Sequence, residues 1–267
     1  MCQLQIFQAI RKSVMAVSIK LLLLLGVLLT LPTHAETASS YQQAMTSWAH
    51  VLASAVDDKG RIDFINLKAK PAELKKVIRF IAKVSPASHP ELFKTRDDIL
   101  AYHLNAYNAL AMHGVIAKDI PNDFTSFFRR ILFFKFHTIT IGGQQTSLYD
   151  YENDVIRPLG DARVHFALNC MVRDCPRLPK QPFRTESLQQ QLDRAAIEFF
   201  NKPTHLRVDN EKETIHLSEI LDFYTDDFVT SGETADLITY INQFRNEAIP
   251  LHYHIEFIDY DWTVNQQ

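Results

Sequence analysis

The feature that most constrains the fold is a long, mostly apolar segment at residues 95–121, "TRDDILAYHLNAYNALAMHGVIAKDIP". Thr95 and Asp98 at its start form the S/T-x-x-D/E pattern of a capped helix N-terminus. Pro121 closes the segment, because proline interrupts a helix. The pattern therefore predicts one long helix between Thr95 and Pro121, the most distinctive element of the chain.

The remaining segments predict a helix-rich α+β domain with a small, mainly antiparallel sheet made of hairpins. Helical patterns predict further helices at 41–56, 67–84, 148–157, 187–201 and 235–247, and one that starts at Ser218. Alternation predicts hairpins at 136–148, around Gly142 and Gly143, and at 205–217, and a strand-like stretch at 251–262. A chain of 267 residues, 46% of them hydrophobic, can bury a proper core, and one domain is the simplest organisation.

Residues 1–35 have the three parts of a signal peptide: a cationic start, an apolar core and small residues before a cleavage site. The apolar core, "LLLLLGVLLTL" at 21–31, is too short to span a bilayer comfortably. Thr33 and Ala35 satisfy the small-residue rule for cleavage. We therefore expect a mature domain, 36–267, that is periplasmic or secreted and has no stable membrane span after cleavage. An uncleaved N-terminal anchor is the alternative.

Loss of residues 1–35 removes three cations and no acids, which changes the formal net charge from −3 to −6. An acidic chain disfavours nucleic acid or acidic lipid as a partner. The chain also lacks a phosphate-cradling glycine loop and the motifs G-x-S-x-G and H-E-x-x-H. We therefore predict no cofactor and no metal, and the expected partner is an unknown small molecule or peptide.

The segment "RVHFALNC" at 163–170 alternates like a buried strand that runs into a proline-rich loop. On a regular strand His165 and Asn169 would share one face, and Cys170 would lie on the opposite, core-facing side. Cys170 and Cys175 are the only cysteines left after signal removal, so an oxidising compartment favours a disulfide between them. A reactive thiol is the alternative, whereas a zinc site would need a further pair of ligands.

Asn105 and Asn108 lie three residues apart and therefore share a face of the long helix. Burial of two amides costs free energy unless each finds hydrogen-bond partners, so the pair predicts either a structural network or a polar pocket. In the second interpretation the helix meets the strand face that carries His165 and Asn169. Glu152 is then the nearest carboxylate to orient the imidazole.

Two functional hypotheses from different classes follow. The first is a protein that binds a small molecule or peptide in a polar pocket around His165, with the three asparagines as ligand-binding residues and without turnover. The second is a hydrolase or transferase that uses His165 and Glu152, with Cys170 as a further candidate. The core-facing thiol favours the first hypothesis. Asp226 and Asp227 are interpreted as a solvated helix end.

Five segments of the chain follow one another in a recognisable order: "LNAYNALAMHGV", "SLYDYENDVIRPL", "VHFALNCMVRDCPRL", "LSEILDFYTDDF" and "YDWTVN". In this order they resemble the DUF547 family, a family of uncharacterised proteins. Together they span nearly all of the chain after residue 35, which makes the whole of 36–267 a DUF547-like domain. The resemblance implies a fold and a set of candidate residues, but no reaction.

Two further points concern the cysteine loop and the fold. The family typically has glycine and serine where this chain has Met171 and Asp174, and loss of the glycine removes easy access to positive φ. An oxyanion-type role of this backbone is therefore disfavoured.

The order of a polar helix before a histidine is also distantly similar to papain-like and transglutaminase-like folds, with an asparagine at the position of their catalytic cysteine.

Overall fold

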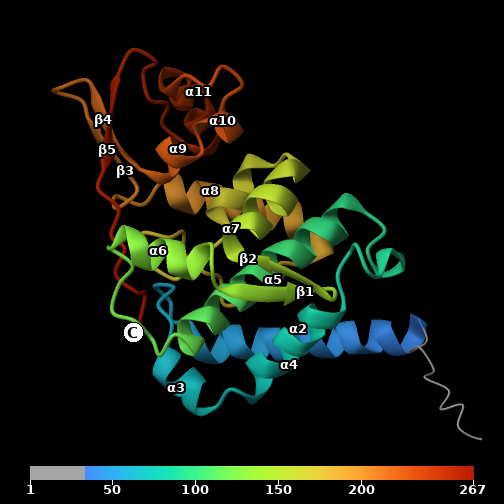
Figure 1. Ribbon diagram of the computed structural model, residues 1–267. Helices are drawn as coiled ribbons and strands as arrows, with labels where there is room; N and C mark the ends of the chain where they lie inside the picture. The colour runs from blue at the N-terminus through green and yellow to red at the C-terminus, as the bar shows by residue number, and fades with distance from the viewer. Residues whose placement is uncertain (1–33) are drawn as a thin grey trace, which may run out of the picture. The chain divides into compact units, whose positions relative to one another are not determined.

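Helix α5, Arg96–Ala117, lies within the first of two hydrophobic cores in the computed structural model of the protein (Figure 1). Its first turn has the predicted capping box: the Thr95 hydroxyl accepts from the backbone N–H of Asp98, and the Asp98 carboxylate accepts from that of Thr95, at 3.1 and 2.9 Å. Every residue from Leu100 to Met112 is buried. A helix that is apolar all round is packed on all sides, so α5 organises the core.

The structure describes residues 34–267, and the predicted signal peptide lies outside the described residues except for its last two positions. Ala38–Gln267 form one compact unit. Within residues 34–267, no helix is both long enough and apolar enough to cross a membrane.

Most of the predicted helices are present, and several differ in extent. The helices besides α5 are α2 (His34–Ala55), α3 (Phe64–Ala69), α4 (Ala72–Lys83), α6 (Phe127–Phe134), α7 (Leu148–Tyr151), α8 (Leu188–Phe200), α9 (Ile220–Phe223), α10 (Thr225–Phe228) and α11 (Leu237–Ile241). The helix expected at 67–84 is broken into α3 and α4, because Pro71 lies between them as the N-cap of α4. The helix expected at 235–247 is only α11 flanked by 3-10 turns. Helix α6 follows from no pattern in the sequence analysis.

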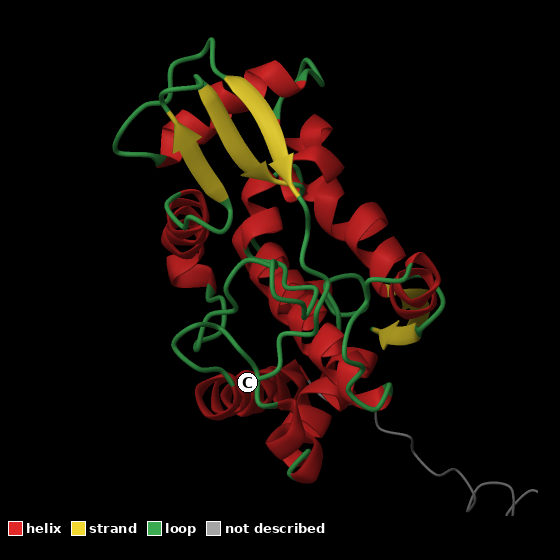
Figure 2. Ribbon diagram, turned by 90° about the vertical axis from the view of Figure 1, so that its left-hand side faces the viewer, coloured by secondary structure: helices red, strands yellow, loops and turns green. Residues whose placement is uncertain are grey.

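The strands confirm both predicted hairpins and form two separate sheets (Figure 2). Strands β1 (Thr138–Ile141) and β2 (Gln144–Ser147) pair antiparallel around Gly142 and Gly143, both of which have positive φ. Strands β3 (Leu206–Asp209) and β4 (Thr214–Ser218) form the second antiparallel hairpin. The C-terminal strand β5 (His254–Ile258) extends the second sheet, but it pairs in parallel with β4.

The second hydrophobic core lies under the three-stranded sheet. Side chains from β4, α8 and α11 meet there, among them Ile215, Leu217, Phe199, Phe200 and Ile241. The α+β fold class is therefore confirmed, with helices in the majority and the two sheets kept small.

The predicted strand at 163–170 is wrong. The segment forms a 3-10 helix, Ala162–Phe166, whose N-cap Asp161 accepts a hydrogen bond from the backbone of Arg163. Its apolar residues divide between the two cores: Val164 and Leu168 belong to the first, and Phe166 belongs to the second. The segment lies between the two cores and is buried on both sides. The alternation of apolar residues in its sequence reflects this two-sided burial and not a β-strand.

Candidate functional site

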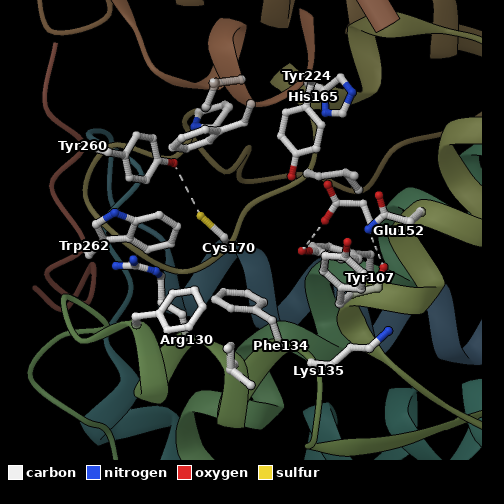
Figure 3. Close-up of a pocket in the computed structure, with 18 of the residues that line it drawn as sticks. Tyr107, Arg130, Phe134, Lys135, Glu152, His165, Cys170, Tyr224, Tyr260 and Trp262 are labelled. Carbon is white, nitrogen blue, oxygen red and sulfur yellow. Dashed lines mark hydrogen bonds between the residues drawn. The ribbon is translucent and has the colours of Figure 1, made fainter. Parts of the chain in front are cut away.

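A cavity of about 620 Å³ opens beside α5, α6 and the turn after α7 (Figure 3). Its volume is within the range of roughly 300–1,000 Å³ that is typical of sites for small organic molecules. The apolar and aromatic lining residues are Tyr107, Phe127, Ile131, Phe134, Phe136, Tyr149, Leu168, Cys170, Pro176, Ile220, Phe223, Tyr224, Tyr260 and Trp262. The polar ones are Arg130, Lys135, Glu152, Asn153 and His165. The cavity is therefore aromatic with a few polar groups, not the polar pocket that the sequence predicted.

Glu152 places a carboxylate in the wall of this cavity. It is the first residue of a π-helical turn, Glu152–Ile156, that continues α7, and such turns are frequent at functional sites. Its carboxylate accepts a 2.9 Å hydrogen bond from the hydroxyl of Tyr107. Burial, followed by the charge of Glu152, raises the pKa of both Tyr107 and Tyr224 well above the usual value. Both phenols therefore stay protonated, and the Tyr107 hydroxyl donates to this carboxylate.

His165 has a different carboxylate partner from the one expected. Its Nε2 lies 2.7 Å from the carboxylate of Asp227, and its ring stacks on Tyr224 with centroids 3.9 Å apart. Asp227 also accepts two hydrogen bonds from Arg157, at 2.6 and 2.9 Å. The prediction that Glu152 orients the imidazole is therefore wrong, as is the interpretation of Asp227 as part of a solvated helix end.

The electrostatics of Asp227 reflect these contacts. Partial burial acts to raise its pKa, but the hydrogen bonds and charges of His165 and Arg157 outweigh burial and hold the pKa well below its usual value. Asp227 is therefore a carboxylate over the whole neutral range. Such a carboxylate fixes the orientation of an imidazole, in the manner of the third member of a catalytic triad.

Asn105 is used within the interior of the protein and does not line the cavity. Its oxygen accepts from the indole of Trp48 and the backbone N–H of Phe183, at 3.1 and 3.0 Å. Its nitrogen donates to the carbonyls of Ala101 and Phe183, both at 2.8 Å. All four hydrogen bonds that an amide commonly makes are thus satisfied by the protein.

Asn108 and Asn169 likewise bond the backbone and lie outside the cavity lining. Asn108 donates to the carbonyl of Ala167 at 2.9 Å and accepts from the backbone N–H of Asn169 at 2.8 Å. The Asn169 side chain donates to the carbonyl of Pro176 and accepts from the N–H of Met171, both at 2.7 Å. These residues form, with Asn105, the amide network of the protein. The geometry therefore agrees with the first interpretation of the asparagines, a structural hydrogen-bond network. The predicted pocket that would bring these amides together with His165 does not form.

Cys170 and Cys175 are joined as predicted. Their sulfur atoms are 2.07 Å apart and their Cα atoms 6.0 Å apart, which is disulfide geometry. The Cys170 sulfur lines the cavity, 3.5 Å from the hydroxyl of Tyr260. A bonded sulfur carries no thiolate, so Cys170 in this form is not a nucleophile.

The loop between the cysteines keeps its backbone conformation without the family's glycine. Met171 has φ of 67°, in the left-handed region, and its side chain is fully buried. Its N–H donates to Asn169, and its carbonyl accepts from Asn265 at 2.9 Å. Without a glycine the positive φ is not easily reached, and here the surrounding hydrogen bonds and packing hold a strained residue in place.

Cationic side chains mark the side of the cavity formed by α6. The Arg130 guanidinium lies over the ring of Trp262, 4.5 Å from its centroid, and donates to the carbonyls of Phe124 and Thr125. Within residues 34–267, Arg130 forms no ion pair. Lys135 pairs with Asp150. The cavity therefore has its buried carboxylate on one wall and a guanidinium without an acidic partner on another.

The sequence analysis missed several residues that build the site. They are Tyr107, Arg130, Arg157, Tyr224, Tyr260 and Trp262. Four of them lie in the quoted segments "LNAYNALAMHGV", "LSEILDFYTDDF" and "YDWTVN". Aromatic residues in these segments were the available signal, although aromatic side chains are more often interpreted as core.

Among residues 34–267 there is also no group of three or more histidine, cysteine or acidic residues that could hold a metal ion.

Comparison with known proteins supports one relationship. Residues 91–200 match the family described as "Protein of unknown function, DUF547". This range includes α5, α6, the first hairpin, Glu152, His165 and the disulfide loop, but not Tyr224, Asp227 or Trp262. No curated protein and no solved structure matches the chain, so the papain-like resemblance stays a prediction. The resemblance seen in the sequence is confirmed over the matched range, and the chain carries a DUF547 domain.

Proposed function

We propose that this protein binds amphipathic small molecules in the aromatic cavity, without turnover. The apolar body of the ligand lies among the phenylalanine, tyrosine and tryptophan side chains, and a cationic or hydrogen-bond-donating head group meets Glu152. One observation carries the proposal. A buried carboxylate lies in the wall of a ligand-sized aromatic cavity, and within the described part of the chain it forms no ion pair.

The energetics of Glu152 support this ligand class. Removal of a carboxylate from water is costly unless hydrogen bonds or an opposite charge compensate. Tyr107 and Tyr224 supply neutral donors, and a carboxylate has room for more hydrogen bonds than these two. A ligand ammonium or hydroxyl would add a charge-assisted hydrogen bond. The surrounding aromatic faces also attract cations.

The same lining favours binding over the hydrolase or transferase alternative. That alternative draws support from the His165–Asp227 pair, since an oriented imidazole is a general base. However, none of the described lining residues is a serine or threonine, and the one cysteine is bonded in a disulfide. An acyl transfer through a covalent serine, threonine or cysteine intermediate would need such a nucleophile. Binding requires no further group.

We further propose that the protein works in the periplasm or outside the cell. The signal-peptide pattern of residues 1–35 and the Cys170–Cys175 disulfide support this location, because disulfides persist in oxidising compartments. The intact mass of protein isolated from the cell envelope should correspond to a chain that begins at Glu36. A mass that retains Met1–Ala35 would contradict cleavage.

Glu152→Gln tests the ligand proposal. The probes are naphthylmethylamine, naphthylmethanol and naphthoate, which share one aromatic body and differ in the head group. We expect the wild-type chain to bind the amine at least about tenfold more tightly than the carboxylate, a difference of roughly 1.4 kcal/mol, in calorimetric titrations. In Glu152→Gln the preference for the amine over the carboxylate should disappear, because glutamine has nearly the same shape as glutamate but carries no charge.

Glu91→Gln is the matched control, since Glu91 is exposed and does not line the cavity. It should leave the affinities and their order unchanged. The proposal fails if none of the three probes binds the wild-type chain, or if the two variants behave alike. Turnover of an ester of naphthylmethanol, lost in His165→Gln, would instead favour the hydrolase.

A further inference from the structure

Helix α6 presents large apolar side chains to solvent. Phe128, Leu132 and Phe136 follow one another at four-residue spacing and are 75, 60 and 69% exposed, and Phe127 beside them is 62% exposed. Residues four apart lie on one side of a helix, so Phe128 and Leu132 project together from α6. Phe127, at the start of α6, and Phe136, just after its end, are exposed beside them. A contiguous patch of exposed apolar side chains often marks a site where a protein binds a partner or a membrane. We call these four residues the α6 stripe.

The charge around the α6 stripe is opposite to that of the chain. Phe127–His137 contain Arg129, Arg130 and Lys135 and no acidic residue, whereas the full chain has a formal net charge of −3. Arg129 and Lys135 pair with acids, but their side chains stay 59 and 44% exposed. Such surface ion pairs contribute little and exchange readily for other anions. The local charge therefore complements an anionic surface even though the overall charge does not.

We propose that the α6 stripe docks the protein onto a membrane surface that contains anionic lipid. Phenylalanine and leucine would enter the boundary between head groups and acyl chains, and the exposed Arg129 and Lys135 would lie at the level of the phosphates. A helix with an apolar side and interspersed lysine and arginine is typical of this kind of interfacial binding. Each cation near an anionic bilayer adds to the attraction.

A second copy of the chain is a poorer occupant for the same surface. A symmetric dimer brings the same patch of both subunits together. The exposed Arg129 and Lys135 would then face the same two cations of the other copy, and like charges across an interface are repulsive. An anionic bilayer removes that repulsion and also covers the apolar side chains. The proposal therefore commits to lipid, and a dimer is an outcome of the test.

The α6 stripe adjoins the cavity. Phe127 and Phe136 line the cavity as well as being exposed, and Phe128 and Leu132 lie outside its lining (Figure 3 shows the adjacent Phe134, Arg130 and Lys135). A docked α6 would therefore bring the cavity close to the acyl region of the bilayer. The docking surface goes beyond the proposed ligand role, and neither depends on the other.

Site-specific fluorescence on the full chain tests the docking surface. A polarity-sensitive NBD label is attached to Phe128→Cys or Leu132→Cys, with Cys2→Ser so that no other free thiol reacts. Ile65→Cys is the matched control, because Ile65 is 65% exposed on α3, away from the α6 stripe. Comparison of sites within one chain separates docking of α6 from any attachment through residues 1–35.

We expect vesicles of phosphatidylcholine with phosphatidylglycerol to increase the NBD emission at positions 128 and 132 at least twofold, with a blue shift. The label at position 65 should not respond. Pure phosphatidylcholine, or high salt, should weaken the response, because salt screens the cations. Unchanged emission at both stripe positions would overturn the proposal. Emission that rises with protein concentration in the absence of vesicles would overturn it in favour of a dimer. Binding of the naphthyl probes to the cavity is measured without vesicles. Failure of the ligand proposal and failure of the membrane-docking proposal are therefore detected in different experiments.

Discussion

Two groups of buried polar side chains lie within the described chain and differ in what they bond. The amide network, Asn105, Asn108 and Asn169, bonds mainly to backbone groups of other segments. The cavity polar group consists of Tyr107, Glu152, His165, Tyr224 and Asp227. Its members are ionisable, interact with one another and, except for Asp227, line the cavity.

The difference shows that burial of polar side chains is no sign of function by itself. Asn105 has no hydrogen-bonding capacity left, so it can only stabilise the protein. The Glu152 carboxylate faces the cavity and can accept further hydrogen bonds, so it can recognise a ligand. The expected consequence is a separation of phenotypes, in which the amide network governs stability and the cavity polar group governs binding.

The largest effect is expected for Asn105→Ala. The change leaves the backbone groups of Phe183 and the indole of Trp48 buried without this partner, and each such loss costs about 1–3 kcal/mol. We therefore expect the free energy of unfolding in urea to fall by roughly 3–5 kcal/mol. The folded fraction should still bind naphthylmethylamine.

Asn246→Ala is the control for this change, because Asn246 is exposed outside the regular helices and strands, and its effect should stay within about 0.5 kcal/mol. Normal stability of Asn105→Ala together with lost probe binding would reverse the comparison, since it would place Asn105 in the ligand site.

An intermediate effect is expected for Asp227→Asn, and it should depend on pH. Asp227 has a pKa in the folded protein below its unfolded value, so its contribution to stability is present above about pH 4 and is lost as pH falls further. At neutral pH we expect a loss of about 1–2 kcal/mol, kept small because the pair with Arg157 is partly solvated. Urea unfolding of both proteins should show the difference narrowing toward about pH 2.

The neighbouring Asp226 is the matched control for Asp227. The two acids are adjacent in the sequence, but among the described residues Asp226 is exposed and forms no ion pair, whereas Asp227 bonds both His165 and Arg157. Asp226→Asn should therefore leave stability nearly unchanged at every pH. Equal pH profiles for the two variants would show that the carboxylate of Asp227 is as solvated as its neighbour.

The smallest effect on stability is expected for Tyr224→Phe. The ring still stacks on His165, and only the hydroxyl that faces Glu152 is removed, so unfolding should change by less than about 1 kcal/mol. The carboxylate then has one competing donor fewer, and naphthylmethylamine should bind a few-fold more tightly in calorimetry. Tyr149→Phe, at the half-exposed side of the cavity, should leave the affinity unchanged. Weaker binding in Tyr224→Phe would indicate that the hydroxyl contacts the ligand itself.

Local chemistry made several elements predictable. The capping box at Thr95, the glycine turn of the first hairpin and the Cys170–Cys175 pair depend on residues within a few positions of one another. Glu152, His165 and Cys170 were selected because their side chains can do chemistry, and all three line the cavity.

The remaining parts of the site depend on distant residues. His165 and Asp227 are 62 positions apart, so no local pattern distinguishes Asp227 from Asp226. The strand predicted at 163–170 was wrong for a similar reason, because alternation reports burial on two sides and does not say whether a sheet or two separate cores cause it.

Short-range geometry and residue order encode the long capped helix, the hairpins, the cysteine pair and the family pattern over residues 91–200, so all of these could be predicted from the sequence. Which buried polar groups face a cavity follows from the tertiary structure alone. That choice depends on where segments far apart in the chain meet: Asn105 meets Phe183 and is fully bonded, whereas Glu152 meets Tyr107 and open space. A side chain has the same chemistry in either place, and its hydrogen-bonding capacity is free only where packing leaves room.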